Sequence, residues 1–486
     1  MHPSAVVADQ HDGVPTARVD PTGPRPRRRG PPGPGRDPQP QRRVDRPVRG
    51  ADPVEQVQRP VDLVEGHSAD QSIGGPVRAA GCSKVDTPRR YPRTTSSTGF
   101  APGPRGKVRR MRVAMVHGGG RPELDGVAHH TRLLGAALRD AGVDIADVPF
   151  RGLRRAVSTI RAAAPDIVHV QFAPSAFGFS ARVGLLPDLL VAPVVTTVHE
   201  YGGRTVPSWV PDRLWDRWER DDLVDRETWR LLPGSAAVVT TNPGHAAAVT
   251  ARSRREPVTI PLAPNVFDRG PADRGRTRRW LGIPADAEVV VFFGFVHPVK
   301  GVRYLVDSVA ALRAGGRSRL HLLVAGGFTS LALPEAEAAA FRADLCAHVE
   351  AAGVAGHVTV TGRLADDAVS AALHAADVAA FPFTAGVTTK SGALLSAFAH
   401  RLPTLVTTAD PPDPALVDGA TVAVAPAVRD GDALATALRR VLDDEVLRAR
   451  LVRGAAVVAQ ERTWPRIAEA HCDLYADVLG RVGADA

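Results

Sequence analysis

The chain has 486 residues, of which 44% are hydrophobic, enough for two or three domains with cores of their own. Residues 1–110 hold 20 Lys and Arg against 11 Asp and Glu, so the whole formal net charge of +9 falls in that segment. The excess of positive charge therefore belongs to an N-terminal tail. It gives no reason to expect specific nucleic-acid binding by the rest of the chain.

The cysteine count and the apolar runs exclude further classes. Cys82, Cys346 and Cys472 are far apart and odd in number, which excludes a disulfide framework or a cysteine zinc site and favours a reducing compartment. The longest apolar run, "VVVFFGFV", is too short to span a bilayer, and the N-terminus lacks the apolar centre of a signal peptide. We expect a cytoplasmic protein, at most peripheral to the inner face of the membrane.

Residues 1–108 are rich in Pro, Gly and Arg and show no helical or alternating periodicity. Burial of so few apolar groups cannot offset the entropy of ordering, so we interpret this segment as a disordered tail. A basic arm for nucleic acid or acidic lipid is the functional alternative. A third hypothesis is an over-extended reading frame, because Met111 opens a good first strand; mass spectrometry of the native N-terminus tests it, and abundant peptides from residues 1–80 would contradict it.

From Met111 onward, buried apolar strands alternate with helices. A first strand, "RVAMVHGG", precedes a helix over 127–141, and further strands are predicted at 166–172, 194–200, 236–242 and 258–266. Because no hairpin signal separates them, the pattern predicts a parallel, doubly wound sheet.

The stretch 267–288 is interpreted as a linker, after which strands and helices alternate again. Helices are expected at 301–314 and 366–376, between strands at 289–296, 320–327, 358–364, 378–383, 403–408 and 421–426. The predicted fold class is α/β, with two Rossmann-like, doubly wound parallel-sheet domains (109–270 and 271–462) that face a cleft. Ligands of such sheets bind outside the carboxyl ends of the strands.

Loops at those ends in the first domain carry candidate site residues. Gly118–Gly120 and Gly126 permit close approach of a ligand to the backbone, just before a helix whose free N–H groups suit an anion. This is no G-x-G-x-x-G fingerprint, and a glycine-rich connection without a ligand is the alternative. His199 ends another strand, where a histidine can bond substrate hydroxyls, and His169 inside its strand is the weaker candidate.

In the second domain, Lys300 follows the strand that ends at Gly294, and a lysine there is a compact cation for a diphosphate. Arg363, at the end of "VTGRL", is a second cationic candidate. A later loop supplies backbone amides at the start of a helix, with a structural loop of the same composition as the alternative; its candidate ligands are Gly386, Thr388, Thr389 and Lys390. No metal-site spacing appears, and "DPPD" at 410–413 reads as a turn.

These segments, in this order, resemble the retaining GT-B glycosyltransferases of family 4 (glycosyl transferases group 1). The matching stretches are "ELDGVAHHTRLLGAALRDAG", "PDIVHVQF", "TTVHE", "VTIPLAPNV", "GFVHPVKGVRYLVDSVAAL", "VTVTGRLADDAVSAALHAADVAAFPF", "LLSAFAHRLPTLVTT" and "TWPRIAEAHCDLYADVL". The resemblance implies transfer of a sugar from a nucleotide diphosphate sugar to an acceptor hydroxyl, with retention of the anomeric configuration. It implies no cofactor and no obligatory metal. It also implies that a final helix, within 463–486, crosses back to the first domain.

By the same resemblance, His199 lies beside the transferred sugar and is catalytic together with Lys300, which also binds the donor phosphates. Gly126, Gly294, Arg363 and the loop residues from Gly386 to Lys390 are donor-binding. Glu200 and Tyr201, directly after His199, are assigned to the acceptor side.

The chain departs from the family pattern at three positions. Phe295 stands where the family has a phosphate-binding arginine, and Thr388 and Ser396 stand at the two glutamates of its E-x7-E signature. We place Thr388 and Ser396 among the donor-binding residues, with neutral hydroxyls in place of carboxylates. The change would cost about 1–3 kcal/mol per charged hydrogen-bonding site, which weakens binding without abolishing chemistry.

Two other functions stay open at this point. One is a catalytically silent GT-B subunit that binds a nucleotide or a partner protein, favoured by the missing glutamates. The other is a nucleotide-sugar epimerase of the 2-epimerase type. The sequence identifies neither the donor, nor the acceptor, nor the oligomeric state. The Trp-rich segment 207–229 is expected either to pack on the first domain or to act as a lid or membrane-adjacent helix.

Overall fold

The structure is a computed structural model that describes residues 110–202, 210–330 and 333–484. The predicted disordered tail lies outside the described residues, as does Trp209 in the Trp-rich segment.

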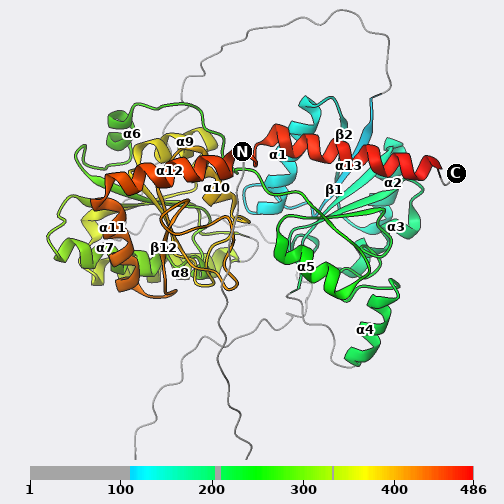
Figure 1. The fold of residues 1–486 in the computed structure, drawn as a ribbon, viewed down its shortest axis with the longest axis horizontal. Coiled ribbons are helices and arrows are strands. Elements are labelled where there is room, and N and C mark those ends of the chain that lie inside the picture. Colours follow the sequence, from blue (N-terminus) through cyan, green and yellow to red (C-terminus); the bar gives the residue numbers. More distant parts are fainter. Residues whose placement is uncertain (1–109, 203–209, 331–332, 485–486) are drawn as a thin grey trace, which may run out of the picture. The chain divides into compact units, whose positions relative to one another are not determined.

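The strands form two parallel six-stranded sheets, in the orders β2-β1-β3-β4-β5-β6 and β12-β11-β10-β7-β8-β9. The predicted fold class of two doubly wound parallel sheets is confirmed (Figure 1). The strands of the first sheet are β1 (Arg112–His117), β2 (Asp144–Pro149), β3 (Ile167–Phe172), β4 (Val194–Val198), β5 (Ala237–Thr240) and β6 (Val258–Thr259). Those of the second are β7 (Glu288–Phe293), β8 (Leu320–Ala325), β9 (Val358–Gly362), β10 (Val378–Phe381), β11 (Thr404–Thr407) and β12 (Ala423–Ala425).

Helices connect the strands of both sheets. In the first half they are α1 (Gly126–Asp140), α2 (Leu153–Ala163), α3 (Leu186–Leu189), α4 (Asp212–Arg220) and α5 (Pro243–Arg252), with short 3-10 turns η1 (Ser175–Phe177) and η2 (Ala181–Leu185). In the second half they are α6 (Arg274–Trp280), η3 (Pro298–Lys300), α7 (Val302–Ala314), α8 (Glu335–Ala351), η4 (Ala355–His357), α9 (Asp366–Ala375), α10 (Gly392–Ala399), α11 (Gly431–Asp443), α12 (Glu445–Gln460) and α13 (Trp464–Ala484).

Three elements differ from the sequence prediction. The strand predicted at 258–266 is only the two residues of β6, because the chain then leaves the sheet toward the second one. Strand β2 was not predicted, because "DIADVP" carries Asp144 and Asp147 instead of a continuous apolar run. It lies at the edge of its sheet, where only one side is paired. Helix α6 lies in the predicted linker. Its Arg278 is 4% exposed and bonds the carbonyls of Ala375 and Ala287, so contacts distant in sequence hold this polar helix in place.

Each sheet has its own apolar packing. The second sheet is buried in one continuous core, which includes Phe292 and Phe381. One face of the first sheet packs against its loops and α2, and the other packs against α1 and α13. Trp464, Ile467 and Tyr475 of α13 belong to that last core, so the final helix of the chain packs against the first sheet.

A short crossover segment, residues 264–268, leads from the first sheet to the second. Trp464 Nε1 donates to Pro264 O over 3.0 Å, and His129 Nε2 of α1 donates to Asn265 O over 3.0 Å. From the other side, Val266 N donates to Ser396 Oγ of α10 over 3.1 Å. The segment is therefore held by helices that pack on both sheets.

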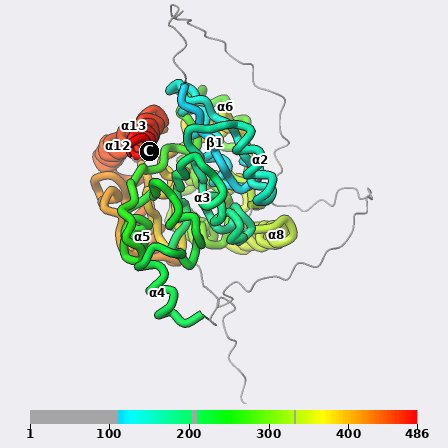
Figure 2. Tube along the Cα trace, turned by 90° about the vertical axis from the view of Figure 1, so that its right-hand side faces the viewer, coloured from blue at the N-terminus to red at the C-terminus, as the bar shows by residue number. Residues whose placement is uncertain are grey.

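Within the Trp-rich segment, residues Asp212–Arg220 form α4, which lies at the periphery of the fold in both views (Figures 1 and 2). Trp215 is 5% exposed, with Trp218 edge-on to it at a centroid distance of 5.5 Å, whereas Trp229 is 40% exposed. Part of the aromatic set is thus packed into the protein.

Candidate functional site

His199 directly follows β4, and burial holds its pKa well below the usual value, so the ring is neutral. Its Nε2 donates to Gln171 Oε1 over 2.8 Å. Because Nε2 carries the proton, Nδ1 carries the lone pair, and within the described residues Nδ1 has no hydrogen-bond partner. The side chain can therefore accept a hydrogen bond from a ligand hydroxyl.

Gln171 belongs to a buried polar chain that reaches α13. Its Nε2 donates to His169 Nε2 over 3.0 Å, and the Thr197 hydroxyl lies 2.7 Å from the same nitrogen. His169 Nδ1 then holds the proton and donates to the Tyr475 hydroxyl over 2.6 Å. His169, the weaker candidate in the sequence, thus acts through Gln171 and fixes the amide so that its oxygen faces His199.

Two lysines lie together beyond the carboxyl ends of β7 and β10. Lys300 Nζ is 3.7 Å from the centroid of the Phe383 ring, and burial together with the charge of Lys390 lowers the Lys300 pKa to about 8. Burial also lowers the pKa of Lys390, against the opposing effect of Glu200. Among the described residues, no carboxylate lies within ion-pair distance of either ammonium group. Two half-buried cations without a carboxylate at ion-pair distance are a candidate site for an anion.

A glycine fixes the position of Lys300. Gly301 has φ +67°, and a Cβ there would lie 1.9 Å from Pro382 O. Only glycine permits this close approach, which brings the end of η3 against the end of β10. Gly301 therefore allows the backbone turn that directly follows Lys300.

His245, in the first turn of α5, completes the group. Lys390 Nζ lies 3.3 Å from its Nε2, and burial with the Lys390 charge lowers the His245 pKa to about 4. The Lys390 charge also helps to lower the His199 pKa, so residues from both sheets lie within electrostatic range of one another. Sequence reasoning missed His245, although its position just after a strand, in "TNPGH", is the same signal that found His199.

The loop before α10 is built on another required glycine. Gly386 has φ +76°, and a Cβ there would meet Thr408 O at 2.1 Å. The Thr389 backbone N–H and hydroxyl both donate to Asp413 Oδ2, over 2.7 and 2.8 Å. The "DPPD" turn therefore supplies a carboxylate that shapes the loop. The half-buried Thr388 hydroxyl accepts from Lys390 N over 3.4 Å.

Ser396 is fully buried inside α10. Its hydroxyl donates to Gly392 O over 2.7 Å and accepts from Val266 N over 3.1 Å. The hydroxyl is therefore engaged with the crossover segment, and the side chain at the second signature position faces the protein interior.

Three further predicted donor-binding residues lie at the ends of strands or helices. Gly126 is exposed at the start of α1, and a Cβ there would meet nothing within 4 Å. Gly294 adopts φ +133° directly after β7. Arg363 is exposed and donates to the carbonyl of Glu123, in the loop before α1.

Glu200 and Tyr201, the predicted acceptor-side residues, differ from one another. Glu200 is exposed, whereas Tyr201 is 7% exposed, donates its hydroxyl to Asp225 and lies under Arg252. Burial, together with Asp225, raises the Tyr201 pKa. Its hydroxyl is thus committed to the protein, and only Glu200 is presented outward.

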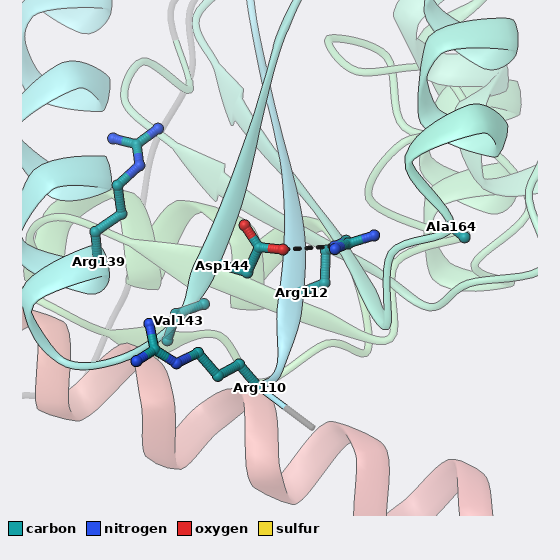
Figure 3. Close-up of a pocket in the computed structure, with 6 residues that line it drawn as sticks. All are labelled: Arg110, Arg112, Arg139, Val143, Asp144 and Ala164. Carbon is teal, nitrogen blue, oxygen red and sulfur yellow. Dashed lines mark hydrogen bonds and ion pairs between the residues drawn. The ribbon is translucent and has the colours of Figure 1, made fainter. Parts of the chain in front are cut away.

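A cavity of about 430 Å³ lies at the other edge of the first sheet, at the amino ends of β1 and β2. It is lined by Arg110, Arg112, Arg139, Val143, Asp144 and Ala164 (Figure 3). None of the predicted site residues lines it, and Arg112 there is paired with Asp144 over 2.7 Å. Ligands of parallel sheets bind at the carboxyl ends of the strands. We therefore take Lys300, Lys390, His199 and His245, and not this cavity, as the candidate site.

No helix within the described parts of the chain is long and apolar enough to cross a membrane. A group of metal-binding type does occur, away from the lysines: ligand atoms of Asp268, His374 and His400 lie within 4.8 Å of one another. The linear spacing of these residues gave no sign of it.

Comparison with known proteins agrees with the fold. Residues 287–444 match the family model described as glycosyl transferases group 1. A D-inositol 3-phosphate glycosyltransferase of Stackebrandtia nassauensis is 32% identical over 267 residues, which are 52% of this chain and 56% of the relative. The chain thus spans little more than half the length of this curated relative.

Solved structures share the whole described fold. A complex of Anabaena HepE with UDP and glucose superposes with a TM-score of 0.57 at 15% identity, covering 76% of this chain and 100% of the other. The sucrose-phosphate synthase of Thermosynechococcus elongatus gives a TM-score of 0.58 at 19% identity, with the same coverage. At these identities the similarity concerns the fold. The described chain thus has the GT-B fold of these structures, and its residues 287–444 resemble the group 1 glycosyltransferases.

Proposed function

We propose that the protein transfers a sugar from a nucleotide diphosphate sugar to an acceptor hydroxyl, with retention of the anomeric configuration. The observation that carries this proposal is the pair of half-buried lysines, Lys300 and Lys390, which have no carboxylate partner among the described residues and lie next to His199 and His245. The complex of the Anabaena protein with UDP and glucose supports a donor of this class.

In this reaction the bond between the sugar and the diphosphate breaks, and negative charge grows on the departing diphosphate oxygen. Two ammonium groups at this point stabilise that charge, and the amides at the start of α10 add to the effect. Because the lysines already supply positive charge, we expect transfer to continue in the presence of EDTA.

His199 orients the transferred sugar. Its proton is fixed on Nε2 by Gln171, so Nδ1 accepts a hydrogen bond from a sugar hydroxyl, and Thr388 supplies a neutral hydroxyl where the family has a carboxylate. Glu200, exposed next to His199, faces the acceptor side. The two proposed lobes of the enzyme are 109–270, for the acceptor, and 271–462, for the donor.

The test is a binding and turnover screen of the full chain with UDP-, GDP- and ADP-sugars, read by calorimetry and by release of nucleoside diphosphate. The name of the Stackebrandtia relative makes D-inositol 3-phosphate the first acceptor to assay. Turnover with one donor supports the proposal, whereas binding without turnover would establish the silent GT-B subunit. Neither binding nor turnover across all donors would overturn both.

A further inference from the structure

Three side chains from three different segments meet behind α10. Asp268 ends the crossover segment, His374 lies in the last turn of α9, and His400 caps the carboxyl end of α10. The geometry points to a binding site for one divalent transition-metal ion, of which Zn²⁺ is the best match, with Asp268, His374 and His400 as protein ligands. The site takes no part in the proposed reaction.

His400 makes one hydrogen bond that is typical of a metal-binding histidine. The ring is 4% exposed, and its Nδ1 donates to Ser396 O over 2.7 Å. Nε2 therefore carries the lone pair and accepts from the Ser370 hydroxyl over 2.8 Å, a bond that a metal ion would replace. A histidine that binds zinc commonly donates its other ring N–H to a backbone carbonyl in this way.

His374 and Asp268 face the same point. His374 Nε2 lies 2.7 Å from Asp268 Oδ1, and the rings of His374 and His400 have centroids 5.0 Å apart. In the free protein the proton on His374 Nε2 bridges this pair. An ion replaces that proton between the two side chains: neutral His374 then holds its proton on Nδ1, and Nε2 and the carboxylate both coordinate.

The surroundings favour a bound cation. Asp268 Oδ1 also accepts from Gly270 N over 2.8 Å, which fixes the direction of the carboxylate. Arg269, the adjacent cation, is turned to Asp367 at 3.1 Å. Ser370 Oγ accepts from Arg269 N, and once the ion takes its place at His400 Nε2 a water provides the fourth position. Two imidazoles, one carboxylate and one oxygen are a ligand set that suits zinc.

Such an ion would join the crossover segment to α9 and α10. The same end of α10 already holds the segment through Ser396 Oγ and Val266 N. Metal binding should therefore stabilise the folded protein, because the ligands are brought together only in the fold.

The experiment uses the full chain, stripped with EDTA, dialysed and titrated with ZnCl2 in calorimetry and thermal unfolding. We expect a saturable site of one ion per chain, a higher Tm with Zn²⁺, and a Co²⁺ complex with visible absorption typical of tetrahedral coordination. His374→Gln, which changes a partly exposed residue, should weaken this site at least tenfold, and Asp268→Asn should do the same.

His348→Gln is the matched control. His348 Nε2 pairs with Asp307 Oδ1 over 2.6 Å, and this pair belongs to no group of three metal-binding side chains in the described part of the chain. Unchanged Zn²⁺ affinity in His348→Gln, with loss in the other two variants, supports the site. Absence of a one-to-one Zn²⁺ complex, or equal affinity in His374→Gln and the parent, would overturn it. Donor binding is measured separately, so failure here leaves the proposed function untouched.

Discussion

His199 and Gln171 lie one residue beyond, and one residue inside, the ends of neighbouring strands β4 and β3, and His199 Nε2 donates to Gln171 Oε1 over 2.8 Å. This bond fixes which nitrogen of His199 is free. Gln171 is itself fixed by His169, which bonds Tyr475 over 2.6 Å across 306 positions of sequence. The orientation of the proposed catalytic histidine thus depends on the last helix of the chain.

Gln171→Leu should reduce the rate of sugar transfer about tenfold or more. The substitution removes the acceptor for a buried N–H, which costs about 1–3 kcal/mol, and it frees the imidazole to change tautomer. The measurement is kcat with saturating donor, together with the free energy of unfolding. Tyr475→Phe is the control one step farther away; it should lower stability with a smaller effect on kcat. Equal kcat in Gln171→Leu and the parent would remove His199 from the chemistry.

Binding of a nucleoside diphosphate should weaken as the pH rises through about 8. Lys300 has its pKa lowered to about 8, so it is mostly charged at pH 7 and mostly neutral at pH 9. A diphosphate prefers the charged form, and its affinity therefore falls on the alkaline side. Calorimetric titration of UDP and GDP from pH 6.5 to 9.5 measures this.

Lys300→Ala is the matching variant. It should bind the preferred diphosphate more than fivefold more weakly at pH 7, and it should lose most of the pH dependence above pH 7.5. A Lys300→Ala protein with the same affinity and the same pH profile as the parent would show that Lys300 does not contact the phosphates.

Gly126→Ala should affect donor binding but not stability, whereas Gly392→Ala should lower stability. The added Cβ at Gly126 meets nothing within 4 Å, so the free energy of unfolding should change by less than about 0.5 kcal/mol, while donor affinity falls if the diphosphate lies against this backbone. The Cβ at Gly392 would lie 2.1 Å from Asn265 Oδ1 and should cost about 1–3 kcal/mol of stability. Urea unfolding and donor titration of both proteins separate the two roles; a Gly126→Ala variant with parental donor affinity would exclude close approach there.

Ser396→Ala should affect stability, whereas Thr388→Ala should affect donor binding. Ser396 is fully buried and its hydroxyl accepts from Val266 N, so its loss should lower the free energy of unfolding by about 1–3 kcal/mol and leave donor affinity within twofold. Thr388 is half-buried beside Lys390, and its loss should weaken donor binding with little effect on unfolding. Parental stability with weaker donor binding in Ser396→Ala would instead make Ser396 the ribose ligand expected from the family alignment.

The sequence by itself determined the elements that local chemistry dictates. Buried strands of a parallel sheet are continuous apolar runs, so the second sheet was predicted directly. Loops at the carboxyl ends of strands stand out by Gly, Lys and His, and this signal made Lys300 and His199 site candidates. Strand β2 escaped because an edge strand need not be apolar throughout.

Only the tertiary structure decided where side chains point and which distant residues meet. Ser396 and Tyr201 are at the positions that the family pattern predicts, yet their hydroxyls bond Val266 N and Asp225 inside the protein. The Tyr475–His169 bond and the Asp268–His374–His400 group join segments with no periodic relation in sequence. Such contacts depend on how helices and sheets pack, because a hydrogen bond or a metal ligand set depends on distance and direction in space, whereas local pattern specifies only the element that carries each residue.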